Sequence, residues 1–346
     1  MDRGIPLLFA ATLAIGSPGA NAQTSSYTIT KTIALGAPDR WDYLTFDAPG
    51  GRLYVSHGDR VTAVDGKSGA ILGQVQTLPG GTHGIAIVPG AARGYTDDGQ
   101  AGIVASFDLK TFQIIHRIRV GLDADGMLFD RPSGHVFVIE GDSGKVNAID
   151  PKTDAVVATI EGGGGLEFGV SGDNGKIYVN GAERNEIVRI DTSTNKTDAH
   201  WAMPGCQKPH GLALDRVTHR LFSSCANKVL VVMNADSGSI VTTLPIGAGT
   251  DADDFDPKRN LVFSSNREGT LSVIAEESPD SFVALPPVAT QFGARTMALD
   301  AESGRIYLVT ADFKQNPNVP ASDARHRYVV TPGSARLLFL DPAVPH

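Results

Sequence analysis

The stretch WDYLTFDAPGGRLYV, residues 41–55, decides the fold because the chain repeats its pattern at nearly regular intervals. A short strand ends in a turn rich in Asp, Pro and Gly, and a second strand of the Arg-Leu-Tyr type follows. Related stretches begin at Thr82, Ala124, Gly165, Pro209, Thr250 and Ala294. Their second positions lie 41 to 44 residues apart, so the chain contains seven copies of one unit.

Each copy continues with two further strand-like segments, such as RVTAVDGKSG at 60–69 and AILGQVQTL at 70–78. Four short strands in about 42 residues is the length of one propeller blade. The ends of the chain are complementary. YTITKTIAL at 27–35 is a fourth strand with nothing before it, and RLLFLDP at 336–342 is a third strand without a fourth. Their pairing removes an open sheet edge, so we predict an all-β, seven-bladed β-propeller closed by the N-terminal strand.

The segments R-L-Y-V, K-I-Y-V and R-I-Y-L, with the V-x-x-I/V-D and G-x-V-V-type strands that follow them, resemble the YVTN-repeat, or YncE-like, family of seven-bladed propellers. The resemblance covers residues 27–342. It implies an architecture more than a chemistry, because that family includes lactonase-like relatives beside proteins of unknown role.

The first 22 residues have the pattern of a secretory signal peptide. Arg3 precedes an apolar run from Ile5 to Gly16, and Ala20-Asn21-Ala22 forms a cleavage-type motif. The apolar run is too short to cross a bilayer, and no later run is longer. We therefore predict a signal peptide at 1–22, a single propeller domain at 23–346, and a periplasmic or secreted location without a membrane span.

The net charge of the chain is −8, and no cluster of Lys and Arg offsets it. Contacts between basic side chains and phosphates supply most nucleic-acid affinity, so the charge disfavours a nucleic-acid partner. We expect a small molecule or a protein partner instead, at the channel-mouth face.

The second position of each repeat places a polar side chain at that face. The first strand of a propeller blade begins beside the central channel, so these seven positions are expected to form a ring around its mouth. In chain order they are Asp42, His83, Asp125, Leu166, His210, Asp251 and Arg295. Leu166 interrupts the polar series, but Glu167 follows it, and a one-residue bulge would bring Glu167 into the ring.

Three interpretations are open for this ring: a metal site, a ligand-binding or catalytic pocket, and a purely structural ring. Ligands suited to Ca²⁺ or a first-row divalent metal are Asp42, His83, Asp125, His210 and Asp251. Crowding also shifts pKa values apart, which makes His83, His210 and Asp125 candidates for acid/base catalysis. Candidates for ligand contact are Arg295, Trp41 and Glu167. A purely structural ring, satisfied by strand ends and water, is the third interpretation.

The ring predicts an exported protein that binds a small ligand, a metal ion or a partner at the channel mouth. The alternative is a metal-assisted hydrolase or lyase acting on a lactone or an acidic sugar, with a ring His or Asp as base and Arg295 on the substrate carboxylate. A polar insertion at 311–334 in blade seven would lie on the same face, as a lid or as a surface segment.

Cys206 and Cys225 are the only cysteines, and they bracket His210. Both are expected on the channel-mouth face, because the second strand of a blade runs back toward it. An even, minimal cysteine count in an exported chain favours a disulfide. A soft-metal site formed by both cysteines and His210 is the alternative. A nucleophilic thiol is disfavoured, because a lone thiol in the periplasm tends to be oxidised.

Overall fold

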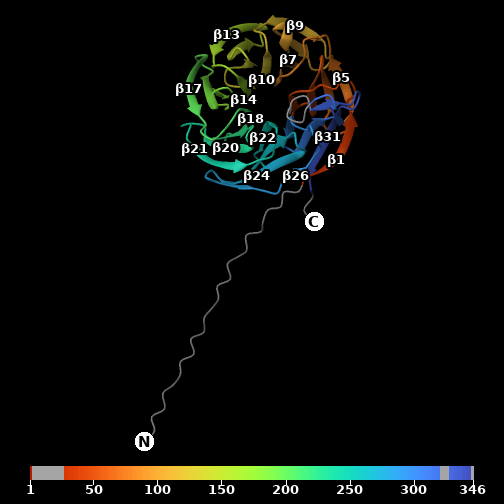
Figure 1. The fold of residues 1–346 in the computed structure, drawn as a ribbon. Coiled ribbons are helices and arrows are strands. Elements are labelled where there is room, and N and C mark those ends of the chain that lie inside the picture. The colour runs from red at the N-terminus through yellow and green to blue at the C-terminus, as the bar shows by residue number, and fades with distance from the viewer. Residues whose placement is uncertain (2–26, 320–326, 344–346) are drawn as a thin grey trace.

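The fold is taken from a computed structural model that describes Met1, residues 27–319 and residues 327–343. Seven sheets stand around a central channel, with the innermost strands β10, β14, β18 and β22 near the centre and β13, β17 and β21 at the periphery (Figure 1). The prediction of an all-β, seven-bladed propeller is confirmed. Apart from Met1, the predicted signal peptide at 1–22 lies outside the described residues.

Blades one to four each contain four strands that are consecutive in sequence. Blade one consists of β2 (Leu44–Asp47), β3 (Arg52–His57), β4 (Arg60–Asp65) and β5 (Ile71–Val75). Blade two consists of β6 (Ile85–Val88), β7 (Arg93–Asp98), β8 (Ile103–Asp108) and β9 (Ile114–Arg119). Blade three consists of β10 (Ala124–Asp130), β11 (His135–Glu140), β12 (Lys145–Asp150) and β13 (Ala155–Glu161). Blade four consists of β14 (Leu166–Ser171), β15 (Lys176–Gly181), β16 (Glu186–Asp191) and β17 (Lys196–Ala202).

Blades five and six follow the same order. Blade five consists of β18 (Pro209–Asp215), β19 (Arg220–Cys225), β20 (Val229–Asn234) and β21 (Ile240–Pro245). Blade six consists of β22 (Thr250–Asp256), β23 (Leu261–Asn266), β24 (Thr270–Ser278) and β25 (Ser281–Ala284), with the short β26 (Val288–Ala289) also paired to β24.

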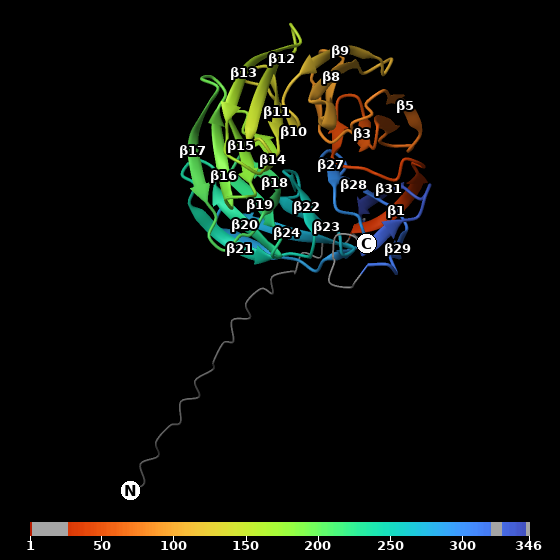
Figure 2. The same ribbon diagram turned by 45° about the horizontal axis from the view of Figure 1, so that its top comes forward.

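Blade seven joins the two ends of the chain. It contains β27 (Met297–Asp300), β28 (Arg305–Thr310), β31 (Arg336–Pro342) and β1 (Tyr27–Ala34). β1 runs antiparallel to β31, with Tyr27 opposite Pro342 and Ala34 opposite Arg336 (Figure 2). The predicted closure by the N-terminal strand is therefore confirmed, and it pairs an edge that would otherwise be open.

The aromatic residue of each repeat packs between blades. It occupies the equivalent place on every second strand, as Tyr54, Tyr95, Phe137, Tyr178, Phe222, Phe263 and Tyr307. All seven side chains are essentially buried. The hydroxyl group of Tyr178 donates to the carbonyl oxygen of Ala235 in blade five at 3.1 Å, and that of Tyr307 donates to Gly66 in blade one at 2.9 Å. The burial of a large ring between blades, which all seven residues share, explains why the repeat keeps this position aromatic.

The predicted insertion of blade seven contains a two-stranded hairpin, formed by β29 (Phe313–Gln315) and β30 (Tyr328–Val330). It lies between β28 and β31, on the face where the innermost strands begin. The described residues contain one three-residue helix, η1 (Gly99–Ala101), and none long and apolar enough to cross a membrane.

Candidate functional site

Each blade brings one ionisable side chain to the same mouth of the channel, from the start of its innermost strand or from the residues just before it. Pairing with the second strand sets the position: Ala124, Leu166, Pro209 and Thr250 lie opposite the ends of β11, β15, β19 and β23. The residue that follows each of them is partly exposed between buried or half-buried neighbours. With the equivalent residues of the other blades, the mouth ring consists of Asp42, His83, Asp125, Glu167, His210, Asp251 and Arg295.

Glu167, and not Leu166, belongs to the mouth ring. Leu166 is buried opposite Gly181, and the register shifts between Leu166 and Gly169. The same kind of shift follows Ala124, Pro209 and Thr250, so the bulge is shared by several blades. All seven blades therefore supply an ionisable group, whereas simple alignment of the repeats leaves blade four apolar.

Polar side chains of the preceding blade hold the backbone of the ring. The Ser56 hydroxyl group of blade one donates to the carbonyl oxygen of His83, and the Asn180 amide of blade four donates to that of His210 at 2.9 Å. The Ser265 hydroxyl group likewise donates to the carbonyl oxygen of Arg295. These bonds satisfy buried backbone acceptors and fix each ring residue relative to its neighbour.

One side of the mouth ring is closed by ion pairs. His210 Nδ1 lies 3.4 Å from Glu167 Oε2 and 3.9 Å from Asp251 Oδ1, and Arg295 Nη1 lies 3.3 Å from Asp251 Oδ2. The contact with Glu167 raises the pKa of His210, against the opposing effect of burial. Four ring residues from neighbouring blades thus form one chain of alternating charge.

His83 has a buried partner outside the mouth ring. Its Nδ1 lies 2.7 Å from Oδ2 of Asp97, whose side chain is fully buried. Asp97 also accepts hydrogen bonds from the backbone N–H groups of His83 and Gly84, both at 2.8 Å. Burial alone would lower the pKa of His83, but the hydrogen bond and the charge of Asp97 outweigh it and raise that pKa to about 9.

Asp42 and Asp125 carry the unpaired charge of the mouth ring. In the described part of the chain, neither side chain forms an ion pair or accepts a hydrogen bond. Burial, followed by the charge of Asp251, raises the pKa of Asp42 to about 7. Burial and the charge of Asp42 also raise the pKa of Asp125 well above its ordinary value. Burial and neighbouring carboxylates therefore oppose the ionisation of both groups.

Tyr43 is a member of the site that sequence reasoning missed. Burial raises its pKa, and the carboxylates of Asp125, Asp42, Glu167 and Asp251 add to that shift. Its ring packs against Phe168 with centroids 5.0 Å apart, and both rings border a waist cavity of about 30 Å³. The residues after the ring positions are Tyr43, Gly84, Gly126, Phe168, Gly211, Ala252 and Thr296. Tyr43 and Phe168 are the only large residues in this set, and that contrast was the sequence signal that could have identified them.

The blade-seven hairpin covers Trp41 at the rim. The Trp41 and Phe313 rings meet edge to face with centroids 6.3 Å apart, and Phe313 meets Phe292 at 5.2 Å. Trp41 also packs against the core between blades one and seven. Its predicted role as a ligand contact stays a prediction. Arg325 and His326 of the insertion lie outside the described residues.

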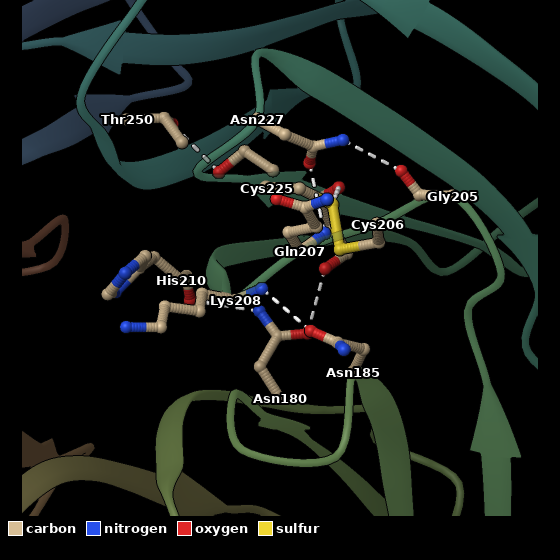
Figure 3. Close-up of a disulfide and its surroundings, with 12 residues drawn as sticks. Asn180, Asn185, Gly205, Cys206, Gln207, Lys208, His210, Cys225, Asn227 and Thr250 are labelled. Atoms are coloured by element: carbon tan, nitrogen blue, oxygen red, sulfur yellow. Dashed lines mark hydrogen bonds between the residues drawn. A yellow bond between two sulfur atoms is a disulfide. The ribbon is translucent and has the colours of Figure 1, made fainter.

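Cys206 and Cys225 form a disulfide, with Cα atoms 5.5 Å apart. Figure 3 shows the bond at the start of the loop that leads to His210, whose imidazole lies on the side away from the sulfur atoms. In the same loop the Lys208 N–H donates to Asn185 Oδ1 at 2.7 Å. The disulfide prediction is confirmed, and the soft-metal alternative is wrong for this form, because neither sulfur is a free thiolate.

Within residues 27–319 and 327–343, no three His, Cys, Asp or Glu side chains are grouped so that they could hold a metal ion. The mouth ring brings the predicted ligands Asp42, His83, Asp125, His210 and Asp251 around one opening, with His83 and His210 engaged by carboxylates. A bound divalent metal stays a prediction.

The comparisons with known proteins identify the fold of the chain. No protein-family model and no curated protein matches the sequence. A solved structure of Kuenenia stuttgartiensis hydrazine synthase is similar over 78% of this chain and 92% of that chain, with a TM-score of 0.69 and 14% identity. A chain of a mitotic checkpoint complex is similar over 98% of this chain and 99% of that chain, with a TM-score of 0.74 and 14% identity. At such identities the likeness shows the seven-bladed propeller fold alone.

Proposed function

We propose that the chain is an exported binding propeller of the YncE-like kind and that its mouth ring takes a small cationic group. The export signal predicted at 1–22 and the disulfide support the location outside the cytoplasm. The ligand is a small molecule carrying an ammonium group, or a divalent cation. A protein partner would reach the same face through a basic side chain.

The unpaired side of the mouth ring carries this proposal. Asp42 and Asp125 are half-buried carboxyl groups whose pKa values are raised by burial and by neighbouring carboxylates, Asp251 acting on Asp42 and Asp42 on Asp125. A cation between them favours the ionised form of both groups, so binding releases protons and relieves their repulsion. Tyr43, at the floor of the ring, adds a neutral hydroxyl group. An ammonium group and a divalent cation share this requirement for convergent oxygen atoms.

Arg295 gives the site a second contact. Its side chain keeps 39% of its surface exposed and touches Asp251 through a single nitrogen atom. A ligand with an anionic group beyond its cationic end would therefore gain a second interaction there. This division of charge favours a small zwitterion over a simple diamine.

The test is isothermal titration of the purified protein near neutral pH with calcium chloride, manganese chloride and the zwitterion 4-aminobutanoate in separate arms. We expect at least one probe to bind, with an affinity that falls about tenfold or more in Asp42→Asn, since one charged contact of the pair is lost. Asp173→Asn, on the opposite face, is the matched control and should bind as the parent does. Absence of binding by all three probes, or equal binding by Asp42→Asn, would refute the proposal.

One observation favours a second candidate, the hydrolase or lyase acting on a lactone or an acidic sugar. The hydrogen bond to Asp97 orients the His83 imidazole, which borders a surface pocket of about 350 Å³. With its pKa raised to about 9, His83 is protonated near neutral pH and suits a general acid. Incubation with a lactone and with a uronic acid, followed by chromatography, tests this candidate. It requires turnover that His83→Gln abolishes.

A further inference from the structure

A second, larger cavity opens at the end of the channel opposite the mouth ring. Its volume is about 480 Å³, within the range of small-molecule sites. It is lined by the later residues of the innermost strands and by the turns that follow them, among them Asp47, Pro89 and Arg131. The packed pair of Tyr43 and Phe168 separates it from the mouth ring.

The wall of this distal cavity is largely aromatic and aliphatic. The large apolar residues that border it include Phe46, Phe129, Phe168, Phe255, Met127 and Met297. They come from five different blades, and Ile85 and Leu212 add the other two, so the ligand would be surrounded on all sides. Such walls bind a flat or compact apolar body and offer ring faces to a cation.

Asp254 is the acidic group placed among these apolar walls. It is partly exposed, and its Oδ1 accepts one hydrogen bond, from the backbone N–H of Phe255 at 2.9 Å. In the described part of the chain it has no ion-pair partner within 4.0 Å. Burial raises its pKa to about 7, against the opposing effects of the Phe255 backbone N–H, of Arg216 and of the Leu299 backbone, while Asp256 adds to the shift. A carboxylate in such surroundings lacks a counter-charge.

The neighbouring charged groups are already engaged. Arg216 lies 3.2 Å from Asp173 and donates to the carbonyl oxygen of Ser171 at 2.8 Å, while Asp256 pairs with Arg259 at 2.8 Å. Two further charged groups, Asp47 and Arg131, border the cavity at its rim.

Asp253, the residue before Asp254, has a buried carboxylate oxygen that lacks a hydrogen-bond partner among the described residues. It borders the same cavity, is 4% exposed, and accepts a hydrogen bond from the Ser224 N–H through Oδ2 at 2.9 Å. In the described part of the chain, the oxygen without a partner is Oδ1. Burial raises the pKa of Asp253 to about 7 as well, so both adjacent carboxyl groups become negative as the pH rises through that value, which favours a cationic ligand over an anionic one.

We propose that the distal cavity is a second binding site, which takes a small arylalkyl amine with its ammonium group on Asp254 and its ring among the phenylalanines. The site is separate from the mouth ring and does not depend on the function proposed for it. Its pH dependence has a defined sign. Only ionised Asp254 pairs with an ammonium group, so affinity rises as the pH passes upward through about 7.

The experiment is isothermal titration of the full chain with 2-phenylethylamine, with 2-phenylethanol and phenylacetate as neutral and anionic matches of the same size. We expect the amine to bind most tightly, with an affinity that increases about tenfold between pH 6 and pH 8 as Asp254 ionises. Asp254→Asn should weaken the amine about tenfold or more, and Asp254→Glu should keep the preference for the amine. Asp236→Asn, on the outer surface, should leave this binding unchanged.

Three results would overturn the proposal: no binding of the amine at millimolar concentration, equal binding of the alcohol, or tighter binding of phenylacetate as the pH falls. If Asp254→Asn does not fold, the pH series and the three probes on the parent protein still decide the question. Loss of amine binding in Asp42→Asn as well would place the ligand at the mouth ring and would also refute the distal site.

Discussion

Tyr43 and Phe168 meet across the channel with ring centroids 5.0 Å apart, and they separate the mouth ring from the distal cavity. At the other five equivalent positions the residue is Gly, Ala or Thr, which leaves room for the two rings. The channel therefore has two chambers of different character, one bordered by ionisable groups and one by apolar walls with Asp254.

Phe168→Ala should open the waist and lower the free energy of unfolding by about 2 kcal/mol, because the removed ring leaves a void that its half-buried surroundings fill only in part. Urea denaturation measures the change. Val217→Ala is the control: the side chain is 85% exposed, so a change within about 0.5 kcal/mol is expected. Equal stability of the two variants would contradict a stabilising role of the Phe168 ring in the channel.

Asp42→Asn should alter how stability depends on pH. The pKa of Asp42 is raised in the fold to about 7, so its protonation stabilises the native state below the unfolded pKa near 4, and this contribution is lost as the pH rises through about 7. The variant should therefore gain stability relative to the parent over that window, by on the order of 1 kcal/mol. Urea denaturation at several pH values, without added ligand, tests the sign. A constant difference would show that Asp42 titrates normally.

Asp97→Asn should remove the carboxylate that raises the pKa of His83. Without the carboxylate, burial becomes the largest influence on the imidazole, and its pKa should fall from about 9 by about 1–3 units. Nuclear magnetic resonance titration of the histidine ring protons measures it. The parent protein, titrated under the same conditions, is the control. An unaltered His83 would mean that Asp97 does not set its charge.

Reduction of the Cys206–Cys225 bond should lower the free energy of unfolding by about 3 kcal/mol, since the bond closes a loop of about twenty residues in the unfolded chain. Denaturation with and without a reductant measures the loss. The double variant Cys206→Ser, Cys225→Ser should match the reduced parent and should not respond to reductant. A parent insensitive to reductant would indicate that the bond contributes little.

Much of the architecture could be predicted because it is written in local pattern. The spacing of the repeats set the number of blades, and the unpaired segments 27–35 and 336–342 predicted the closure that β1 and β31 make. Six members of the mouth ring followed from the same alignment. Glu167 did not follow directly, because a bulge changes which of two adjacent residues faces the channel, and strand pairing decides that.

The sequence by itself determined the repeat, the alternation and turns that make each blade, and the pairing of Cys206 with Cys225, since these depend on neighbours along the chain and on composition. The tertiary structure alone decided which charges meet, the ion pairs from Glu167 to Arg295, and the isolation of Asp42 and Asp125. It also decided the two-chamber channel. Coulomb energy and desolvation depend on distance and burial through space, and neither quantity can be obtained from spacing along the chain.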